Sequence, residues 1–292
     1  MQKRKMKKYI HILCAVLTVV FASCSQSEIG DEAPQSKQTI LKVAADQGLN
    51  TRAEASGVSH YFVEVYTDNA YSKVANVFSN GTTNKATCSD GSFSMILDKN
   101  LDYYCLLWAD RDATSEVYTT SSLKAVTLVG GKAPVEAWQG TLTIAKGTTT
   151  PSALLKRAVA KITLLETGTL KAGTLTMAFK QNTVFDVSAG ATKTEADRTE
   201  SITMSAIDVA VPAGKKINTN DIFVLASTVD AEQPTLTFQI TGEAEGTSVS
   251  NVPLKANFNT NIKGHYSKES GATFTIICDN DWAGDKAGTV TE

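Results

Sequence analysis

From residue 39 onward the chain is a succession of short runs of β-branched, aliphatic and aromatic residues separated by turn residues. Several runs alternate apolar and polar residues, as in Leu236–Ile240 and Phe274–Cys278, which is the pattern of a strand with one buried face. No long stretch has the 3.6-residue period of an amphipathic helix. Many short strands at this spacing predict an all-β chain built from β-sandwiches with Greek-key connections.

The predicted strands lie at 39–45, 61–66, 92–97, 103–109, 125–129, 140–145, 158–165, 174–179, 183–187, 201–205, 207–211, 221–226, 236–241 and 273–278. Clusters of Gly, Asn, Asp and Thr separate them. The polar stretch 146–153 contains Gly147 and Pro151 and lies between two strong strand signals, so it predicts a boundary between two domains. The charged, Thr-rich segment 189–200 is predicted to be a long exposed loop.

The start of the chain has the order of a bacterial export signal. Basic residues between Lys3 and Lys8 precede an apolar run from Tyr9 to Ala22, and small residues lead into Cys24. The run is shorter than the ~20 residues that cross a bilayer as a helix, so it predicts a cleaved signal. The segment around Cys24 resembles a lipobox, in which the cysteine after the cut receives a lipid that anchors the chain. The alternative is a plain signal peptide cut near Ala22, which leaves Cys24 as an ordinary thiol.

Composition excludes some classes of function. A net charge of -2 and a pI near 6.0 lack the basic footprint of a nucleic-acid-binding protein. With 42% hydrophobic and 20% charged residues, the chain can bury real cores. Once Cys24 is acylated, the mature chain keeps Cys88, Cys105 and Cys278, an odd number for a disulfide framework. Cys88 and Cys105 could pair in an oxidising compartment, but we favour three unbridged thiols packed as small hydrophobic residues.

The sequence offers little from which to build a catalytic or metal site. Its 3 histidines are His11, His60 and His265, and no Cys-x-x-Cys, His-x-x-His or His-Glu-x-x-His spacing occurs. Without a base partner for a serine or cysteine, nucleophilic catalysis has little support. We therefore expect no enzymatic activity, no metal and no cofactor; an unrecognised pair of carboxylates is the exception that only the fold would reveal.

Two local clusters resemble binding sites but have simpler interpretations. Asp279, Asp281 and Asp285 around Trp282 supply oxygen atoms, yet their spacing lacks the alternating ligands and central glycine of a calcium loop. A polar turn after the last strand is therefore favoured. The aromatic run Tyr103–Trp108 could be a platform for a carbohydrate, but an apolar run of this length is more often a strand buried on both faces.

Six features along the chain point to one family of proteins. They are the lipobox with its tether, a first strand at 39–45 followed closely by Thr51-Arg52-Ala53, an aromatic strand from Tyr103 to Asp110, the segments 155–162 and 252–262, and a closing strand that leads to Trp282. In content and in order they resemble the fimbrillin family of Bacteroidales, the subunits of type V pili.

The resemblance implies two transthyretin-like β-sandwich domains in tandem, after a signal peptide over 1–23. It implies a lipidated tether and removable first strand over 24–52, an N-terminal sandwich over 53–150 and a C-terminal sandwich over 151–292. It also implies that the subunit reaches the surface of the outer membrane as a lipoprotein, where a trypsin-like protease cuts after an arginine near the end of the first strand. Removal of this strand opens an apolar groove that a strand of a neighbouring pilin subunit fills.

Carried onto this chain, the resemblance assigns Cys24 as the lipid site and Arg52–Ala53 as the cleaved bond. Leu41, Val43 and Ala45 become the inward face of the expelled strand. The alternative for Arg52 is a solvated loop arginine without a role. Two basic residues of segment 155–162, Arg157 and Lys161, are expected to be structural, facing solvent or a partner across the seam between the domains.

The end of the chain departs from the family. After Trp282 only the polar residues 283–292 remain, which form a poor donor strand unless the strand at 273–278 can itself leave. The chain is therefore interpreted as a structural subunit, or an accessory or tip subunit, of a fimbria that serves adhesion. The rival interpretation is a monomeric surface lipoprotein that binds a glycan or host ligand. Exposed aromatic residues in a concave patch would favour the rival, and a removable edge strand beside an exposed Arg52 would favour the pilin.

Overall fold

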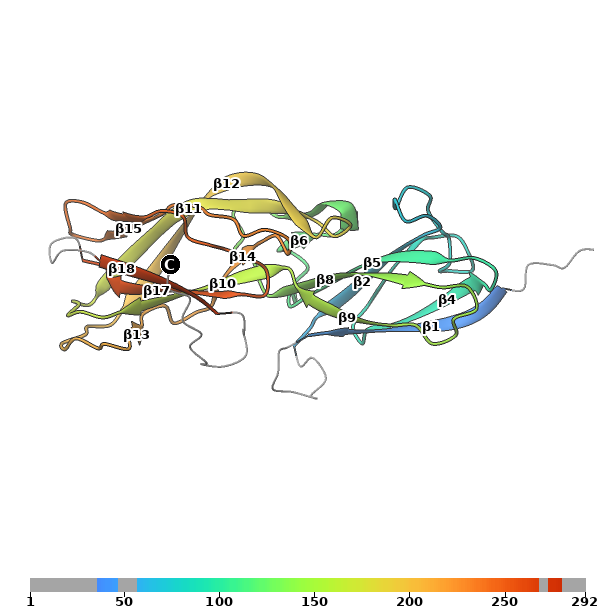
Figure 1. Ribbon diagram of the computed structural model, residues 1–292, viewed down its shortest axis with the longest axis horizontal. Helices are drawn as coiled ribbons and strands as arrows, with labels where there is room; N and C mark the ends of the chain where they lie inside the picture. The colour runs from blue at the N-terminus through green and yellow to red at the C-terminus, as the bar shows by residue number, and fades with distance from the viewer. Residues whose placement is uncertain (1–35, 47–56, 268–272, 280–292) are drawn as a thin grey trace, which may run out of the picture. The chain divides into compact units, whose positions relative to one another are not determined.

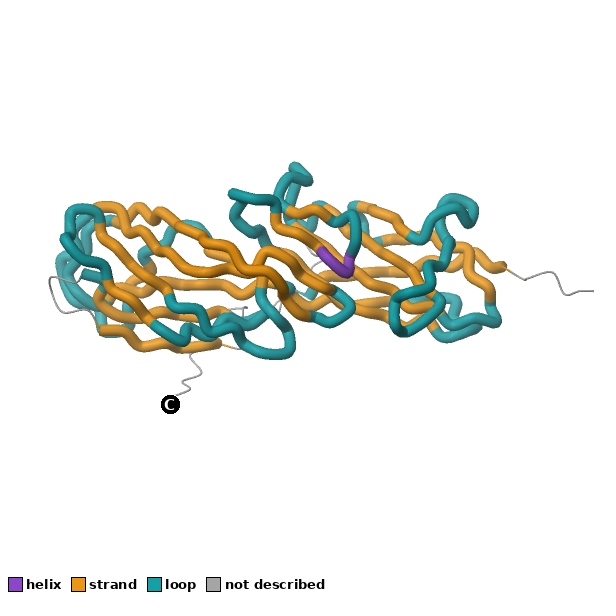
Figure 2. The backbone as a smooth tube through the Cα atoms, turned by 90° about the horizontal axis from the view of Figure 1, so that it is seen from above, coloured by secondary structure: helices purple, strands orange, loops and turns teal. Residues whose placement is uncertain are grey.

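The computed structural model describes residues 36–46, 57–267 and 273–279. Among the described residues, the regular secondary structure consists of β-strands and one three-residue 3-10 helix, η1 (Leu123–Ala125). Figure 2 shows η1 in purple. The hydroxyl of Ser122 caps η1 by accepting a hydrogen bond from the backbone N–H of Lys124. The strands form three sheets (Figure 1), so the prediction of an all-β chain is confirmed.

The first sheet has seven strands in the order β3-β2-β5-β8-β9-β1-β4. They are β1 (Ser36–Ala45), β2 (His60–Tyr66), β3 (Lys85–Cys88), β4 (Ser92–Asp98), β5 (Tyr103–Asp110), β8 (Ala137–Ile144) and β9 (Ser152–Arg157). The end strands β3 and β4 are consecutive in the chain and joined by a short turn at Gly91, so the sheet curves around its own core. This first core includes Leu41, Val43, Ala45, Tyr61, Val63, Phe93, Met95, Leu107, Trp138 and Leu155.

The other two sheets pack face to face. The five-stranded sheet consists of β10 (Val159–Glu166), β13 (Lys215–Lys216), β14 (Ile222–Leu225), β17 (Asn259–His265) and β18 (Thr273–Asp279). The six-stranded sheet consists of β6 (Tyr118–Thr119), β7 (Val126–Leu128), β11 (Gly173–Asp186), β12 (Ala191–Met204), β15 (Leu236–Ile240) and β16 (Thr247–Val249). Apolar side chains of both sheets meet in a second core that includes Ile162, Leu164, Met177, Ile202, Val224, Phe238 and Ile262.

A third apolar cluster lies where the chain leaves the first sheet. Trp108 of β5 packs against Phe185 of β11, with ring centroids 5.8 Å apart, and against Tyr118 at 5.4 Å. The backbone N–H of Ala158 donates to the carbonyl of Ala137, and β10 then begins in the five-stranded sheet. The polar stretch 146–153, where the sequence predicts a domain boundary, falls between β8 and β9, which both belong to the first sheet.

The prediction of an exposed loop at 189–200 is wrong. Most of this segment lies in β12, which pairs with β11 along nearly its whole length. The alternation is hidden in the sequence because an inward position is held by Arg198, whose guanidinium donates to Gln181 Oε1 at 3.0 Å and to the carbonyl of Phe223 at 2.6 Å. The predicted strand at 207–211 is also wrong, since Ile207 makes only an isolated bridge to Leu170.

Candidate functional site at the first strand

Strand β1 joins two strands that are not neighbours in the sheet. Its residues Ser36–Lys42 run antiparallel to β4, and its residues Lys42–Ala45 run parallel to β9 (Figure 1). The strand is therefore internal to the sheet, and is not the edge strand that the sequence analysis associates with a removable segment. Without β1, β4 would lose its backbone partners along Ser92–Asp98 and β9 would lose its partners along Ser152–Leu155, which would open a slot between the two strands.

The inward face of β1 fills the first core. Leu41 is fully buried, and Val43 and Ala45 are 8% and 7% exposed, so these three side chains point into the core. Thr39 continues the same alternation and is also buried, which the sequence analysis did not include. The outward face is exposed and carries Ile40, with 49% of its surface accessible.

A turn glycine lies close to the backbone of β1. Gly91 has a φ of +70°, and a Cβ built there would lie 2.2 Å from the carbonyl oxygen of Val43. The N–H of Val43 donates to the carbonyl of Gly91 at 2.8 Å. Only glycine combines this backbone conformation with this approach, so the β3–β4 turn is shaped to lie against β1.

A buried tryptophan forms a hydrogen bond with Asp46, the residue that directly follows β1. The indole N–H of Trp138, on β8, donates to the carbonyl oxygen of Asp46 at 2.8 Å. The N–H of Asp46 in turn donates to the carbonyl of Leu155 on β9 at 2.8 Å. Both bonds lie at the end of β1 where it runs beside β9.

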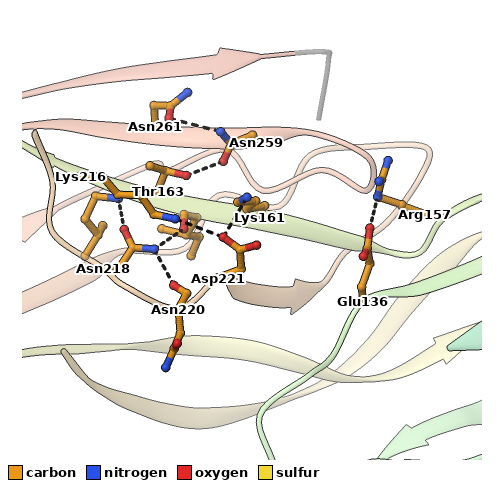
Figure 3. A network of polar contacts seen from close by, with 12 residues as sticks. Glu136, Arg157, Lys161, Thr163, Lys216, Asn218, Asn220, Asp221, Asn259 and Asn261 are labelled. Carbon is orange, nitrogen blue, oxygen red and sulfur yellow. Dashed lines mark hydrogen bonds and ion pairs between the residues drawn. The ribbon is translucent and has the colours of Figure 1, made fainter. Parts of the chain in front are cut away.

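Charged side chains lie close to the Trp138 ring. The guanidinium carbons of Arg111 and Arg157 lie 5.5 and 6.0 Å from the ring centroid. Both arginines pair with the buried carboxylate of Glu136, Arg111 at 2.8 Å and Arg157 at 2.6 Å, and the second pair appears in Figure 3. Arg157 also reaches Asn257 Oδ1 at 3.4 Å, in the segment before β17. We call this group, Arg111, Glu136, Trp138 and Arg157, the tryptophan cluster.

The structure gives different surroundings to Arg157 and Lys161 of segment 155–162. Arg157 is buried, whereas Lys161 forms an ion pair at 2.9 Å with the half-exposed Asp221 (Figure 3). Both are structural residues within the described part of the chain, as the sequence analysis expects. Arg157 does not face solvent, because Glu136 neutralises it inside the fold.

One grouping has the residue types of a nucleophilic triad. Ser115 Oγ lies 3.4 Å from His60 Nε2, and His60 Nδ1 lies 3.5 Å from Asp110 Oδ1. Both distances exceed the ~2.6–3.2 Å of a working triad. Burial raises the pKa of Asp110, although hydrogen bonds from the Trp108 indole and the Asp112 backbone oppose the shift. Because both distances are too long for proton transfer along the grouping, we assign it a structural role.

No other part of the described chain forms a site of a different kind. Among the described residues there is no cluster of His, Cys, Asp or Glu that could hold a metal ion, and no helix is long and apolar enough to span a membrane. Cys88, Cys105 and Cys278 are unbridged, and burial raises the pKa of Cys105 to about 12. The aromatic run Tyr103–Trp108 is part of β5 and is buried except at Tyr104, which agrees with its interpretation as core.

Several residues singled out in the sequence lie outside the described part of the chain. They are Cys24, Arg52, Ala53, Asp281, Trp282 and Asp285. The lipid site at Cys24 and the cleavage bond Arg52–Ala53 therefore stay predictions.

Solved structures with a similar fold come from species of Bacteroides. A candidate adhesin from Bacteroides thetaiotaomicron has a TM-score of 0.53 and 12% identity, over 86% of this chain and 98% of that chain. A candidate cell adhesion protein from Bacteroides ovatus has a TM-score of 0.51 and 13% identity, over 86% and 99%. Candidate polysaccharide binding proteins from Bacteroides thetaiotaomicron have a TM-score of 0.51 and 13% identity, over 83% and 96%. At these identities the likeness shows the fold alone.

Sequence comparison adds one match. A family model described as a family of unknown function (DUF6562) matches residues 31–292. No curated protein matches the chain.

Proposed function

We propose that this chain, which belongs to the DUF6562 family of unknown function, is a fimbrillin-like subunit of a cell-surface fimbria. It is exported as a lipoprotein acylated at Cys24 and cut at the Arg52–Ala53 bond. It then assembles with other subunits by strand exchange and serves adhesion without catalysis. Its two transthyretin-like domains meet near Ala158, where the chain passes from the seven-stranded sheet to the five-stranded sheet.

The observation that carries this proposal is the position of β1. The strand fills the slot between β4 and β9 with four inward side chains, and in sequence it precedes every other described strand. A single cut at Arg52–Ala53 falls between the end of β1 at Ala45 and the start of β2 at His60. After that cut, only non-covalent contacts would retain β1.

Physical chemistry favours refilling an emptied slot. Its walls would present unpaired N–H and C=O groups together with the apolar side chains that pack on Leu41 and Val43. A strand from a neighbouring subunit supplies both the backbone partners and the apolar surface. The lipid would leave with β1, so attachment to the membrane would be exchanged for attachment to a polymer.

The solved structures support a role at the cell surface only in a general way. Two of them are described as a candidate adhesin and a candidate cell adhesion protein, which is consistent with adhesion as the task of this fold. The rival, a glycan-binding lipoprotein, has its parallel in the candidate polysaccharide binding proteins. We favour the pilin because no aromatic side chain is among the strongly exposed large apolar residues of the described part, which are Ile40, Val74, Ile96, Leu101, Leu154, Val209 and Val229.

The test is the N-terminal sequence and intact mass of the surface protein after exposure to an arginine-specific protease. We expect the wild-type chain to begin at Ala53, free of lipid, and to form oligomers. The matched control is Arg52→Lys, which keeps the charge but removes the cleavage site, and it should begin at acylated Cys24 and stay monomeric. A wild-type chain that stays uncut and acylated would contradict the proposal and favour the rival.

A further inference from the structure

We propose that the indole N–H of Trp138 anchors the far end of whichever strand fills the slot between β4 and β9, and so selects its direction and length. This inference rests on the proposed function. The occupant is an extended segment of a second subunit that runs parallel to β9. It must reach the position that Asp46 holds in the free chain and present a backbone carbonyl there.

The first step is the contact itself. Trp138 is fully buried, and in the described structure its N–H donates to Asp46 O at 2.8 Å. A buried donor without an acceptor costs free energy, so an occupant that ends before this position leaves the indole N–H unsatisfied. A longer occupant satisfies it.

The second step is the fixed orientation of the indole. In the tryptophan cluster, two guanidinium groups that share the carboxylate of Glu136 lie 5.5 and 6.0 Å from the ring centroid and limit its movement. A donor that is already oriented discriminates between partners better than a mobile one, because it cannot turn to follow a misplaced carbonyl. The structure therefore provides a rigid reference point at the end of the slot.

The third step concerns direction. β9 is registered with β8 only at Arg157 and Lys156, whereas Ser152–Leu155 are registered with β1. The occupant therefore supplies the pairing for most of β9. Parallel and antiparallel ladders place their hydrogen bonds differently, so a reversed occupant would match neither this pairing nor the indole N–H.

The core positions that the inward side chains of β1 occupy also restrict which side chains the partner segment can carry. In chain order β1 places Thr39, Leu41, Val43 and Ala45 in the core, so the last site accommodates a small side chain. A suitable partner segment has a hydroxyl residue, two aliphatic residues and a small residue at alternate positions, and one further residue that supplies the carbonyl. This spans eight residues, counted from Thr39 to Asp46.

The first test uses the uncut full-length chain and measures hydrogen exchange. Trp138→Phe should speed exchange over residues 43–46 by about 2- to 10-fold, the effect of one lost neutral hydrogen bond, and leave Ser36–Thr39 unchanged. The matched control is Trp108→Phe. This variant also removes a buried indole N–H, which donates to Asp110 Oδ2 at 2.9 Å, but Trp108 is no part of the first core. It should leave exchange over β1 unchanged.

A second variant keeps the test decisive if phenylalanine disturbs the fold. Benzothienylalanine at position 138 keeps the bicyclic shape of tryptophan and replaces the N–H with sulfur. Equal exchange over 43–46 in this variant and the wild type would overturn the proposal, as would an equal increase in Trp108→Phe.

The partner side of the proposal is tested with peptides on the protease-cut chain. A peptide of residues 36–46 should bind more tightly than a peptide of residues 36–44, and Trp138→Phe should reduce this preference by about 2- to 10-fold. An unchanged preference would contradict the anchoring role. If the wild-type chain is never cut, the proposed function fails, while the exchange experiment on the uncut chain still decides the role of Trp138.

Discussion

Truncation of Leu41 tests whether β1 is an integral part of the first core. Leu41→Ala removes three carbon atoms from a fully buried side chain that packs in the first core with Phe93 and Met95. The lost transfer free energy is ~0.8 kcal/mol for each methylene equivalent, and the cavity adds to it. We expect the free energy of unfolding to fall by about 2–5 kcal/mol.

The matched control is Ile40→Ala, one residue earlier on the same strand. Ile40 points outward and is 49% exposed, so its truncation should cost about 1 kcal/mol or less. Both variants are compared with the wild type by urea denaturation, followed by tryptophan fluorescence and by circular dichroism. Because the urea dependence is ~1–3 kcal/mol per molar, the Leu41 variant should unfold at a midpoint lower by about 1 M or more. Equal shifts for the two variants would refute the reasoning, since the slot would then not depend on the inward face of β1.

Three further predictions concern other parts of the fold. Arg157→Gln should lower the free energy of unfolding by about 3 kcal/mol because it breaks a buried ion pair, whereas Lys161→Gln should cost about 1 kcal/mol or less; equal losses in denaturation would contradict this. Burial alone would raise the pKa of Asp186, but hydrogen bonds from a lysine ammonium and a serine hydroxyl outweigh it and the pKa is lowered. The wild type should therefore be more stable than Asp186→Asn above pH ~4 and lose this advantage as the pH falls through the lowered pKa; a pH-independent difference in stability would count against it. Cys105, with its pKa of about 12, should react with thiol reagents only on unfolding, and peptide mapping that finds it labelled in the folded chain would disprove its burial.

The strands that could be predicted from the sequence are those whose inward side chains pack against apolar side chains. β1, β4, β5 and β15 have regular alternation or a continuous apolar run, because their inward side chains meet other carbon surfaces. β12 escaped prediction since Arg198 occupies an inward position, where Gln181 of β11 and the backbone carbonyl of Phe223 of β14 accept hydrogen bonds from it. Alternation of hydrophobicity cannot identify a buried arginine whose partners are distant in the sequence.

The neighbours of β1 could not be predicted for a related reason. The family resemblance implied the inward face of Leu41, Val43 and Ala45, but the parallel pairing with Ser152–Leu155 is set by the topology of the whole sheet. The hydrogen bond of Trp138 could not be predicted from its neighbours in the sequence either, because its acceptor at Asp46 lies 92 residues away. The polar stretch 146–153 suggested a boundary, yet it connects two strands of one sheet.

The two-sided pairing of β1 has a mechanical consequence. Its hydrogen bonds lie across the strand direction, to β4 along one part and to β9 along the other. A pull along the strand from Ser36 therefore loads these bonds in shear, and many of them must break together before the strand slides. A pull across the strand would instead open them one after another. A chain held through this strand would resist tension along its length much better than peeling from the side.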